Sequence, residues 1–240
     1  MAHELLQNAP LRTKALSMIP SISSRFPRFL LSTALAIGTL ATLGSAPEAS
    51  AQVAAAATPS APAAENASAP IRELYNALRS AQTTGSTAQK RVAILSPAVD
   101  KAFDLEAILR RSVGYRYDGL SSADKARLVA SFRQFTVARY ASSFKPGTGA
   151  VFTLLPQTRP NPSGGQIVDT TIGGGSDAPT PINYVMTQGA TGWRATDVLL
   201  NAHISQVAAQ RADFSSALAK GGASALADLL DSKTARFLRD

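Results

Sequence analysis

Asp197 and His203 are the two residues of this chain whose types and spacing could do acid–base chemistry. They lie six residues apart, on either side of the point where the hydrophobic pattern changes from strand to helix. A histidine held near a carboxylate can act as a general base. No nucleophile sits at a recognisable elbow beside them, so we favour an ordinary hydrogen-bonding role for His203 in the turn.

Asp197 lies inside a predicted strand, an unusual place for a carboxylate. We expect it to pair with a buried or half-buried arginine, either Arg110 or Arg139, because a buried charge needs a partner. A structural role for Asp197 is favoured over a catalytic one.

The composition gives little support for a metal or cofactor site. The chain of 240 residues has no cysteine and two histidines, His3 and His203, which disfavours thiolate chemistry and zinc or iron sites. The run 173–175 of three glycines lacks the lysine and the following helix of a phosphate-binding loop, and it is typical of a hairpin. We expect no metal and no other cofactor.

Positive charge is concentrated in one part of this basic chain, whose formal net charge is +8. No acidic residue occurs from 125 to 168, whereas the basic residues there are Lys125, Arg127, Arg133, Arg139, Lys145 and Arg159. Such a field suits anionic headgroups or an acidic protein surface, so the first five are candidate headgroup or partner contacts. The alternative is an ordinary solvated helix face. We do not expect nucleic acid as a ligand, because the nearby aromatic residues share the apolar side of the predicted helix. The first 51 residues also predict export.

The first 51 residues have the pattern of a secretory signal peptide. Arg25 and Arg28 precede an uncharged run, and Ala49–Ala51 is a small-x-small cleavage site. The apolar core of about 15 residues is shorter than the roughly 20 that a membrane span needs. We expect export to the periplasm, with Met18 as an alternative start that would give a leader of more usual length.

Residues 52–69 are rich in alanine and proline, which predicts a disordered tether, and residues 70–240 form the folded domain. Helical periodicity occurs in the ranges 71–81, 88–95, 105–113, 121–144, 204–218 and 223–230. Strand patterns occur in the ranges 151–155, 166–172, 182–186 and 193–199. Helices followed by consecutive strands predict an α+β domain, with a helical layer packed on an antiparallel meander of about four strands.

Several residues mark the ends of these helices. Asp104 is placed to cap the helix at 105–113, and Ser121 with Asp124 forms a capping-box pattern. Gly221 and Gly222 end one helix, and another begins directly after them.

Two blocks of sequence resemble a known family. The first, between Trp193 and Leu230, reads W-R-x-x-D-V, then I-S, then R-x-[DE]-F-S-S-x-L, then G-x-x-x-L-x-x-L; the second runs from Phe103 to Phe144. The chain resembles the MlaC or toluene-tolerance family of periplasmic phospholipid-binding proteins, the auxiliary components of Mla-type ABC transporters. Within it, the hopanoid-associated HpnM-like subgroup is most similar. In the family a glycine usually occupies the turn where this chain has Ala202 and His203.

The resemblance implies a curved sheet and helices that enclose a hydrophobic cavity for acyl tails. Candidate lining residues are Phe103, Ile108, Val113, Phe132, Phe135, Tyr140, Val168, Tyr184, Met186 and Val198. It further implies a non-enzymatic carrier that exchanges phospholipid or hopanoid with membrane-anchored Mla-type components, and we expect a monomer. The alternative from another class is a small periplasmic hydratase or isomerase that uses Asp197 and His203. A third hypothesis is that the protein is purely structural.

Overall fold

The computed structural model describes residues 61–174 and 177–239. The described helices are α1 (Ala61–Thr84), α2 (Ala88–Ala102), α3 (Leu105–Val113), α4 (Ser122–Ser143) and α5 (Gln206–Phe237), with a 3₁₀ turn at Gly114–Arg116. The described strands are β1 (Val151–Pro160), β2 (Gln166–Gly174), β3 (Asp177–Gly189), β4 (Gly192–Leu200) and β5 (Ile204–Ser205). The predicted signal peptide and the tether before residue 61 lie outside these residues.

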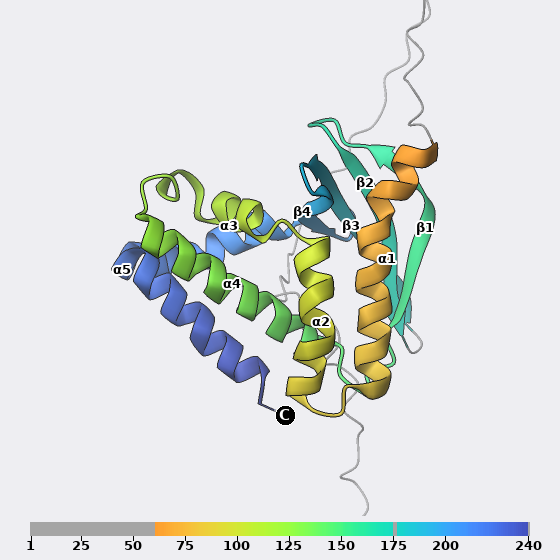
Figure 1. Cartoon of the computed structure of the whole chain (residues 1–240), viewed down its shortest axis with the longest axis horizontal. Coiled ribbons are helices and arrows are strands. Elements are labelled where there is room, and N and C mark those ends of the chain that lie inside the picture. The colour runs from red at the N-terminus through yellow and green to blue at the C-terminus, as the bar shows by residue number, and fades with distance from the viewer. Residues whose placement is uncertain (1–60, 175–176, 240) are drawn as a thin grey trace, which may run out of the picture. The chain divides into compact units, whose positions relative to one another are not determined.

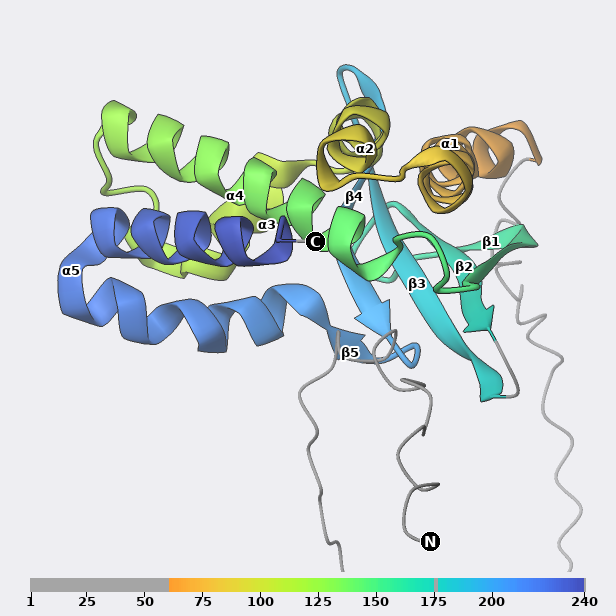
Figure 2. The same cartoon turned by 90° about the horizontal axis from the view of Figure 1, so that it is seen from below.

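The strands form one curled antiparallel sheet in the order β1-β2-β3-β4-β5. The helices gather against one face of this sheet and against its β4–β5 edge (Figures 1 and 2). The predicted α+β class and antiparallel meander are confirmed. The sheet has one strand more than expected, because Ile204 and Ser205, predicted as the start of the helix at 204–218, pair with Leu200 and Leu199 instead.

The helix-end signals act as the sequence predicts. The Asp104 side chain accepts a hydrogen bond from the Ala107 amide, and the Ser121 hydroxyl accepts one from the Asp124 amide. Gly221 and Gly222 leave helical geometry, so α5 consists of two helical halves joined at this pair. Among the described residues, no helix combines the length and the apolar character needed to cross a membrane.

Three helices extend beyond their predicted ends: α1, α2 and α5, the last of which continues from the predicted end at residue 230 to Phe237. α1 begins at Ala61 and so includes residues 61–69, which the sequence analysis assigns to the tether. α2 continues through Pro97 to Ala102. In α1 and α2, Ala67 and Ala102 are fully buried, and tertiary packing outweighs the local cost of a proline inside each helix.

Six aromatic side chains join the helices to the sheet in a closed circuit of ring contacts. Adjacent ring centroids are 5.0 to 6.2 Å apart. In order around the circuit, the residues are Tyr75, Phe152, Phe144, Tyr140, Phe103 and Tyr184. This aromatic circuit connects α1, α4 and the segment after α2 to β1 and β3. Buried aromatic pairs of this kind stabilise a core beyond the area that they bury.

Polar side chains of α1 bind the backbone beside and within the edge strand β1. The Gln82 side chain donates to the Ala150 carbonyl at 3.1 Å and accepts from the Ala150 amide at 2.9 Å. Arg79 donates to the Phe152 carbonyl at 3.0 Å. The first helix is therefore attached to the start of β1 by hydrogen bonds as well as by the aromatic circuit.

Arg91 is a buried cation that the sequence analysis does not single out. The residue is 2% exposed, and its guanidinium donates to the Ala141 carbonyl at 2.8 Å and to the Gly85 carbonyl at 2.9 Å. It thereby joins the end of α4 to the turn between α1 and α2. Gly85 leaves room for this contact, because a Cβ at that position would collide with the Ala81 carbonyl oxygen and with the Arg91 side chain.

We expect Gly85→Ala to lower the free energy of unfolding by about 1–3 kcal/mol, because the backbone and the buried arginine must both shift. Gly119→Ala is the matched control, since the nearest atom to its added Cβ would be the Arg116 carbonyl oxygen at 3.8 Å. Urea denaturation of both variants measures the difference. Equal stability of the two would contradict the packing described for Gly85.

Candidate functional site: an apolar cavity between sheet and helices

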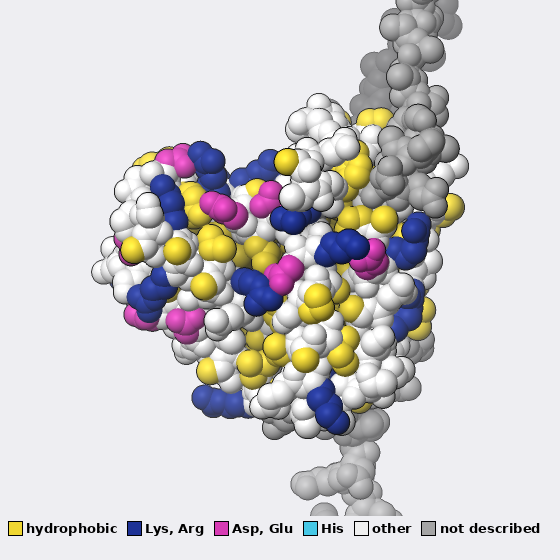
Figure 3. Space-filling view, in the orientation of Figure 1, with side chains coloured by type: hydrophobic (Ala, Val, Ile, Leu, Met, Phe, Trp, Pro, Cys, Tyr) yellow, Lys and Arg dark blue, Asp and Glu magenta, His cyan; other side chains and the backbone are white. Residues whose placement is uncertain are grey.

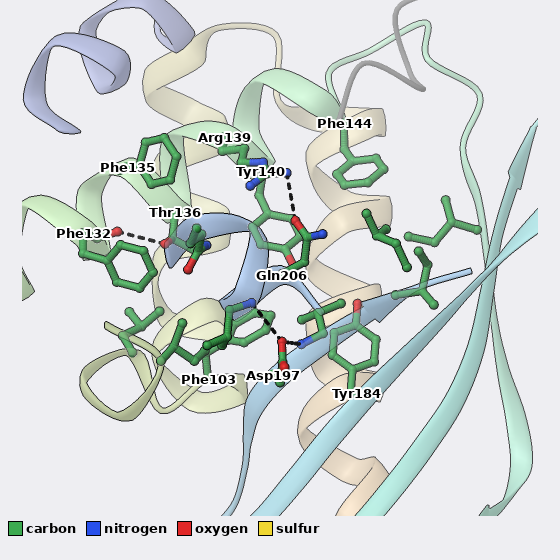
Figure 4. Close-up of a pocket in the computed structure, with 18 residues that line it drawn as sticks. Phe103, Phe132, Phe135, Thr136, Arg139, Tyr140, Phe144, Tyr184, Asp197 and Gln206 are labelled. Atoms are coloured by element: carbon green, nitrogen blue, oxygen red, sulfur yellow. Dashed lines mark hydrogen bonds between the residues drawn. The ribbon is translucent and has the colours of Figure 1, made fainter. Parts of the chain in front are cut away.

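A cavity of about 90 Å³ lies between the helix-facing side of β2, β3 and β4 and the helices α3, α4 and α5 (Figure 4). Most of its wall is aromatic or aliphatic: Phe103, Leu105, Ile108, Phe132, Phe135, Tyr140, Phe144, Ile172, Ile182, Tyr184, Val198, Leu200 and Val207. The polar lining residues are Thr136, Arg139, Asp197, Gln206 and Gln210. Four members of the aromatic circuit, all but Tyr75 and Phe152, form part of this wall.

The periods of strand and helix explain why these side chains meet. Alternate residues of a strand face one side of a sheet, which places Ile182 beside Tyr184 and Val198 beside Leu200. On α4, residues three or four positions apart share a face, which places Phe132, Phe135 and Arg139 along the cavity. One side of the cavity is therefore built by the sheet and the other by the helices.

Seven of the ten predicted lining residues do face this cavity: Phe103, Ile108, Phe132, Phe135, Tyr140, Tyr184 and Val198. The other three, Val113, Val168 and Met186, are buried in the core outside it. Sequence reasoning missed Ile172, Ile182 and Leu200, although extending the period-2 pattern from Val168, Tyr184 and Val198 would have found them. Contact of any of these residues with lipid remains a prediction.

A second and wider depression, of about 630 Å³, lies on the other face of the sheet. It is lined in part by Val185, Thr187 and Trp193, together with the turn at Asn161–Gly165 and with Arg111 of α3. Its wall is about half polar, whereas the wall of the first cavity is mainly apolar. The apolar cavity is therefore the better candidate for binding a hydrocarbon chain.

Buried hydroxyl groups border the apolar cavity on its α1 side. The Tyr184 hydroxyl donates to the Tyr75 hydroxyl at 3.4 Å, and Tyr75 lies 2.6 Å from the hydroxyl of Thr170. Thr170 in turn donates to the Ile182 carbonyl. Burial raises the pKa of Tyr140 and the pKa of Tyr184 well above the usual value for tyrosine. Both phenols thus stay neutral at any physiological pH.

These pKa shifts predict a loss of stability in alkali. The unfolded chain releases its tyrosine protons near pH 10, whereas the folded chain holds them, so stability is full below pH 10 and falls above it. Between pH 8 and pH 11 we expect a loss on the order of 1 kcal/mol for each buried tyrosine. Urea denaturation of Tyr140→Phe should show a smaller loss than the unmodified protein, and an equal loss would contradict the assignment.

Comparison with known proteins decides the family. Residues 69–232 match the family model described as MlaC protein. This chain belongs to the MlaC family. The structure is similar to that of a phospholipid-binding protein from Ralstonia solanacearum in complex with a phospholipid, with a TM-score of 0.61 and 15% sequence identity, over 72% of this chain and 99% of that one. At this identity the likeness concerns the fold. No curated protein matches the chain.

In this MlaC-family chain, Asp197 is committed to the junction between β4 and α5. Its carboxylate accepts hydrogen bonds from the Ser205 hydroxyl at 2.5 Å, the Val198 amide at 2.7 Å and the Val207 amide at 3.1 Å. The predicted pairing of Asp197 with Arg110 or Arg139 is wrong, because β5 brings the start of α5 onto the carboxylate. Arg110 instead forms an ion pair with Asp118.

His203 does not act with Asp197. Its ring Nδ1 lies 2.6 Å from the Asn201 carbonyl oxygen, and the side chain is exposed. Asn201 and Ala202 both have positive φ values, of 50° and 66°. This left-handed backbone is the conformation that favours glycine, and it explains why a glycine suits this turn.

Asp197→Ala should lower the free energy of unfolding by about 1–3 kcal/mol, because the Val198 amide in β4, the Val207 amide in α5 and the Ser205 hydroxyl lose their acceptor. Asp231→Ala, an exposed change on the second half of α5, should change it by less than about 0.5 kcal/mol. Urea denaturation compares the two. A fully stable Asp197→Ala protein would contradict the structural role.

The predicted basic field is largely compensated in space. Arg127 pairs with Asp228, Arg133 with Asp100 and Arg159 with Asp169, at distances of 2.5 to 2.9 Å. Lys125 donates to the Asp118 carbonyl, and Lys145 is exposed. The acids that are missing from this stretch of sequence come from other elements. Among the five candidate contacts, Arg139 differs from the rest because it lines the cavity.

Proposed function

We propose that this protein is a lipid carrier that buries acyl tails in the cavity and leaves the polar group of the lipid at its edge. The observation that carries the proposal is the apolar cavity itself, which is lined mainly by aromatic and aliphatic side chains in a chain of the MlaC family. The similar fold of a phospholipid-binding protein supports it. No bond is made or broken in this function.

The physical need for such a cavity follows from the cost of exposing hydrocarbon to water. At about 0.8 kcal/mol per methylene, a tail of about 16 carbons carries an unfavourable hydration free energy above roughly 10 kcal/mol. Aromatic and aliphatic walls offset this cost. A carrier must also release its lipid, so the affinity of the cavity has to differ between the free and the docked protein.

The cavity must widen before it can hold a tail. A volume of 90 Å³ is smaller than the roughly 150 Å³ that accommodates benzene. The first half of α5 is the wall best suited to move, because it contributes only Phe214 and Leu218 to the core, whereas the second half contributes five residues. This half is bounded by the turn at Asn201–Ala202 and by the break at Gly221–Gly222.

We propose that this member of the MlaC family works in the periplasm, where the predicted signal peptide would direct it. We propose phospholipid as the main ligand and hopanoid as an alternative, which reflects the resemblance to the HpnM-like subgroup. Exchange with membrane-anchored Mla-type transport components completes the proposal.

The alternative enzymatic function gains no support from the site. Asp197 binds backbone amides and a serine, and His203 binds a carbonyl oxygen in an exposed turn. Neither arrangement leaves an acid–base pair aimed at a common substrate position.

Native mass spectrometry tests the carrier function. The protein from Gln52 to Asp240 would be purified from its own periplasm without detergent, and its lipids extracted and identified. We expect phospholipid or hopanoid at a fixed ratio to protein. A protein that is bare after purification and stays bare when mixed with phospholipid vesicles would overturn the proposal.

Val198→Trp should reduce lipid occupancy at least tenfold, because a large ring would fill the cavity from the β4 side. Val151→Trp is the matched control, since Val151 lies on a strand but is 61% exposed and does not line the cavity. Occupancy is measured by native mass spectrometry, and folding by circular dichroism. Undiminished occupancy in a folded Val198→Trp protein would place the lipid elsewhere.

A further inference from the structure

A wall of the cavity must move before an acyl tail can enter. The cavity holds about 90 Å³, less than the roughly 150 Å³ that accommodates benzene. On the face of the molecule that Figure 3 shows, basic and acidic side chains are interspersed among apolar ones rather than gathered around one entrance. The route into the cavity therefore depends on which wall is displaced most easily.

The first half of α5, residues 206–220, forms a wall of the cavity and is held to the sheet at its start. Gln206, Val207 and Gln210 line the cavity. The Asp197 carboxylate accepts a hydrogen bond from the Val207 amide at 3.1 Å, which keeps the first turn of the helix on β4. This end of the wall is therefore a fixed pivot.

The other end of this wall is a chain reversal with space around it. At Gly221–Gly222 the backbone leaves helical geometry, and the second half of α5 returns alongside α4 (Figures 1 and 2). Gly222 has a φ of 62°, and a Cβ added there would meet no atom beyond the adjacent residues within 4 Å. The reversal can therefore change its backbone angles without a clash, so the wall can turn about its start.

Few apolar contacts oppose such a movement. Within residues 206–220, the buried side chains are Phe214 and Leu218. Phe214 packs edge-on against Phe132 of α4, with ring centroids 6.3 Å apart, and Phe132 also lines the cavity. A tail that enters beside Phe132 would take over contacts that Phe214 gives up, so the movement leaves little apolar surface in water.

Two polar contacts hold the middle of this wall against the last turn of α3. The Ser112 hydroxyl donates to the Gln210 side-chain oxygen at 3.0 Å. The Arg211 guanidinium donates to the Arg111 carbonyl, at 3.1 Å from Nε and 2.5 Å from Nη2. We call this pair of contacts the α3 latch. It joins the cavity wall to an element on the other side of the cavity.

The α3 latch can open without leaving a buried polar group unpaired. The Ser112 hydroxyl also lies 2.8 Å from the Ile108 carbonyl, which remains as its acceptor when the wall moves away. Arg211 is exposed, so water can replace the carbonyl at its guanidinium. α3 itself stays in place, because the Asp104 amide at its start donates to the Ala195 carbonyl of β4 at 3.0 Å.

We propose that the first half of α5 is a gate held shut by the α3 latch, and that its opening limits the rate at which lipid enters and leaves the cavity. The inference rests on the proposed carrier function and specifies how the same site is regulated. While the latch is closed, Gln210 and Arg211 stay on α3 and the cavity is too small for a tail. When it opens, the helix turns about its start and the cavity widens between α3 and α5.

A covalent bridge across the α3 latch tests the gate. The chain has no cysteine, so Ser112→Cys combined with Gln210→Cys supplies a single thiol pair, which dibromobimane joins in the lipid-free protein from Gln52 to Asp240. Uptake of pyrene-labelled phosphatidylglycerol from dioleoylphosphatidylcholine vesicles is followed over time. We expect the bridge to slow uptake at least tenfold relative to the same double variant before bridging.

Thr148→Cys combined with Gln82→Cys is the matched control. The Thr148 hydroxyl donates to the Gln82 side-chain oxygen at 2.8 Å, the same kind of contact, but neither residue lines the cavity. Bridging this pair should leave the rate of uptake unchanged. Circular dichroism checks that each protein is folded.

Arg211→Gln opens the latch from the other contact. It should speed both uptake and release at least threefold, because the guanidinium no longer holds the Arg111 carbonyl. Arg72→Gln, which removes an exposed arginine from α1, should change neither rate.

Hydrogen exchange tests the gate without lipid. Amides of residues 206–220 should exchange at least tenfold faster than those of residues 223–237, and the bridge at Ser112 and Gln210 should remove this difference. Equal exchange in the two halves, or equal uptake before and after bridging, would overturn the gate while leaving the carrier function intact. Failure of every unbridged protein to take up lipid is a different outcome, which would overturn the carrier function itself.

Discussion

The aromatic circuit is the interaction on which the rest of this structure depends. The chain has no cysteine, so the domain cannot be held by disulfides and must rely on packing. Six rings close a path from α1 through β1 and α4 back to β3, and four of them also form the cavity wall. The groups that hold the helices to the sheet are thus largely the groups that would meet a ligand. In the proposed carrier, the same side chains would therefore serve both stability and ligand binding.

Polar contacts at the start of α5 complement this apolar framework. Asp197 ties the end of β4 to Ser205 and to the first turn of α5. The same short segment places Gln206 and Gln210 beside Arg139. The junction therefore gives the cavity its one polar side, and it does so with a carboxylate that the sequence presents as a candidate catalytic group.

Local signals in the sequence predict much of this fold. The bounds of α3 follow from the cap at Asp104, and the break in α5 follows from Gly221 and Gly222. The class, the meander and seven of the cavity-facing positions are predicted, because periodicity depends on residues close together in the chain.

What the sequence could not predict depends on contacts between distant segments. α1 includes Ala67, which is buried although composition alone predicts disorder there, and β5 exists only because Ile204 and Ser205 meet the end of β4. Arg133 finds Asp100 at a separation of 33 residues, so a stretch without acids in sequence is compensated in space. The partners of Asp197 are determined in the same way, by the path of the chain and not by residue type.

The attachment of α1 to β1 has a consequence for the behaviour of the protein at high concentration. An edge strand presents unpaired backbone groups that can recruit a strand from another molecule. Here Gln82 and Arg79 occupy backbone groups at the start of β1, while Pro156, Pro160 and a bulge between Leu154 and Thr158 interrupt the remainder. The open side of the sheet is thereby a poor template for edge-to-edge aggregation, even with Val151 and Leu155 exposed on it.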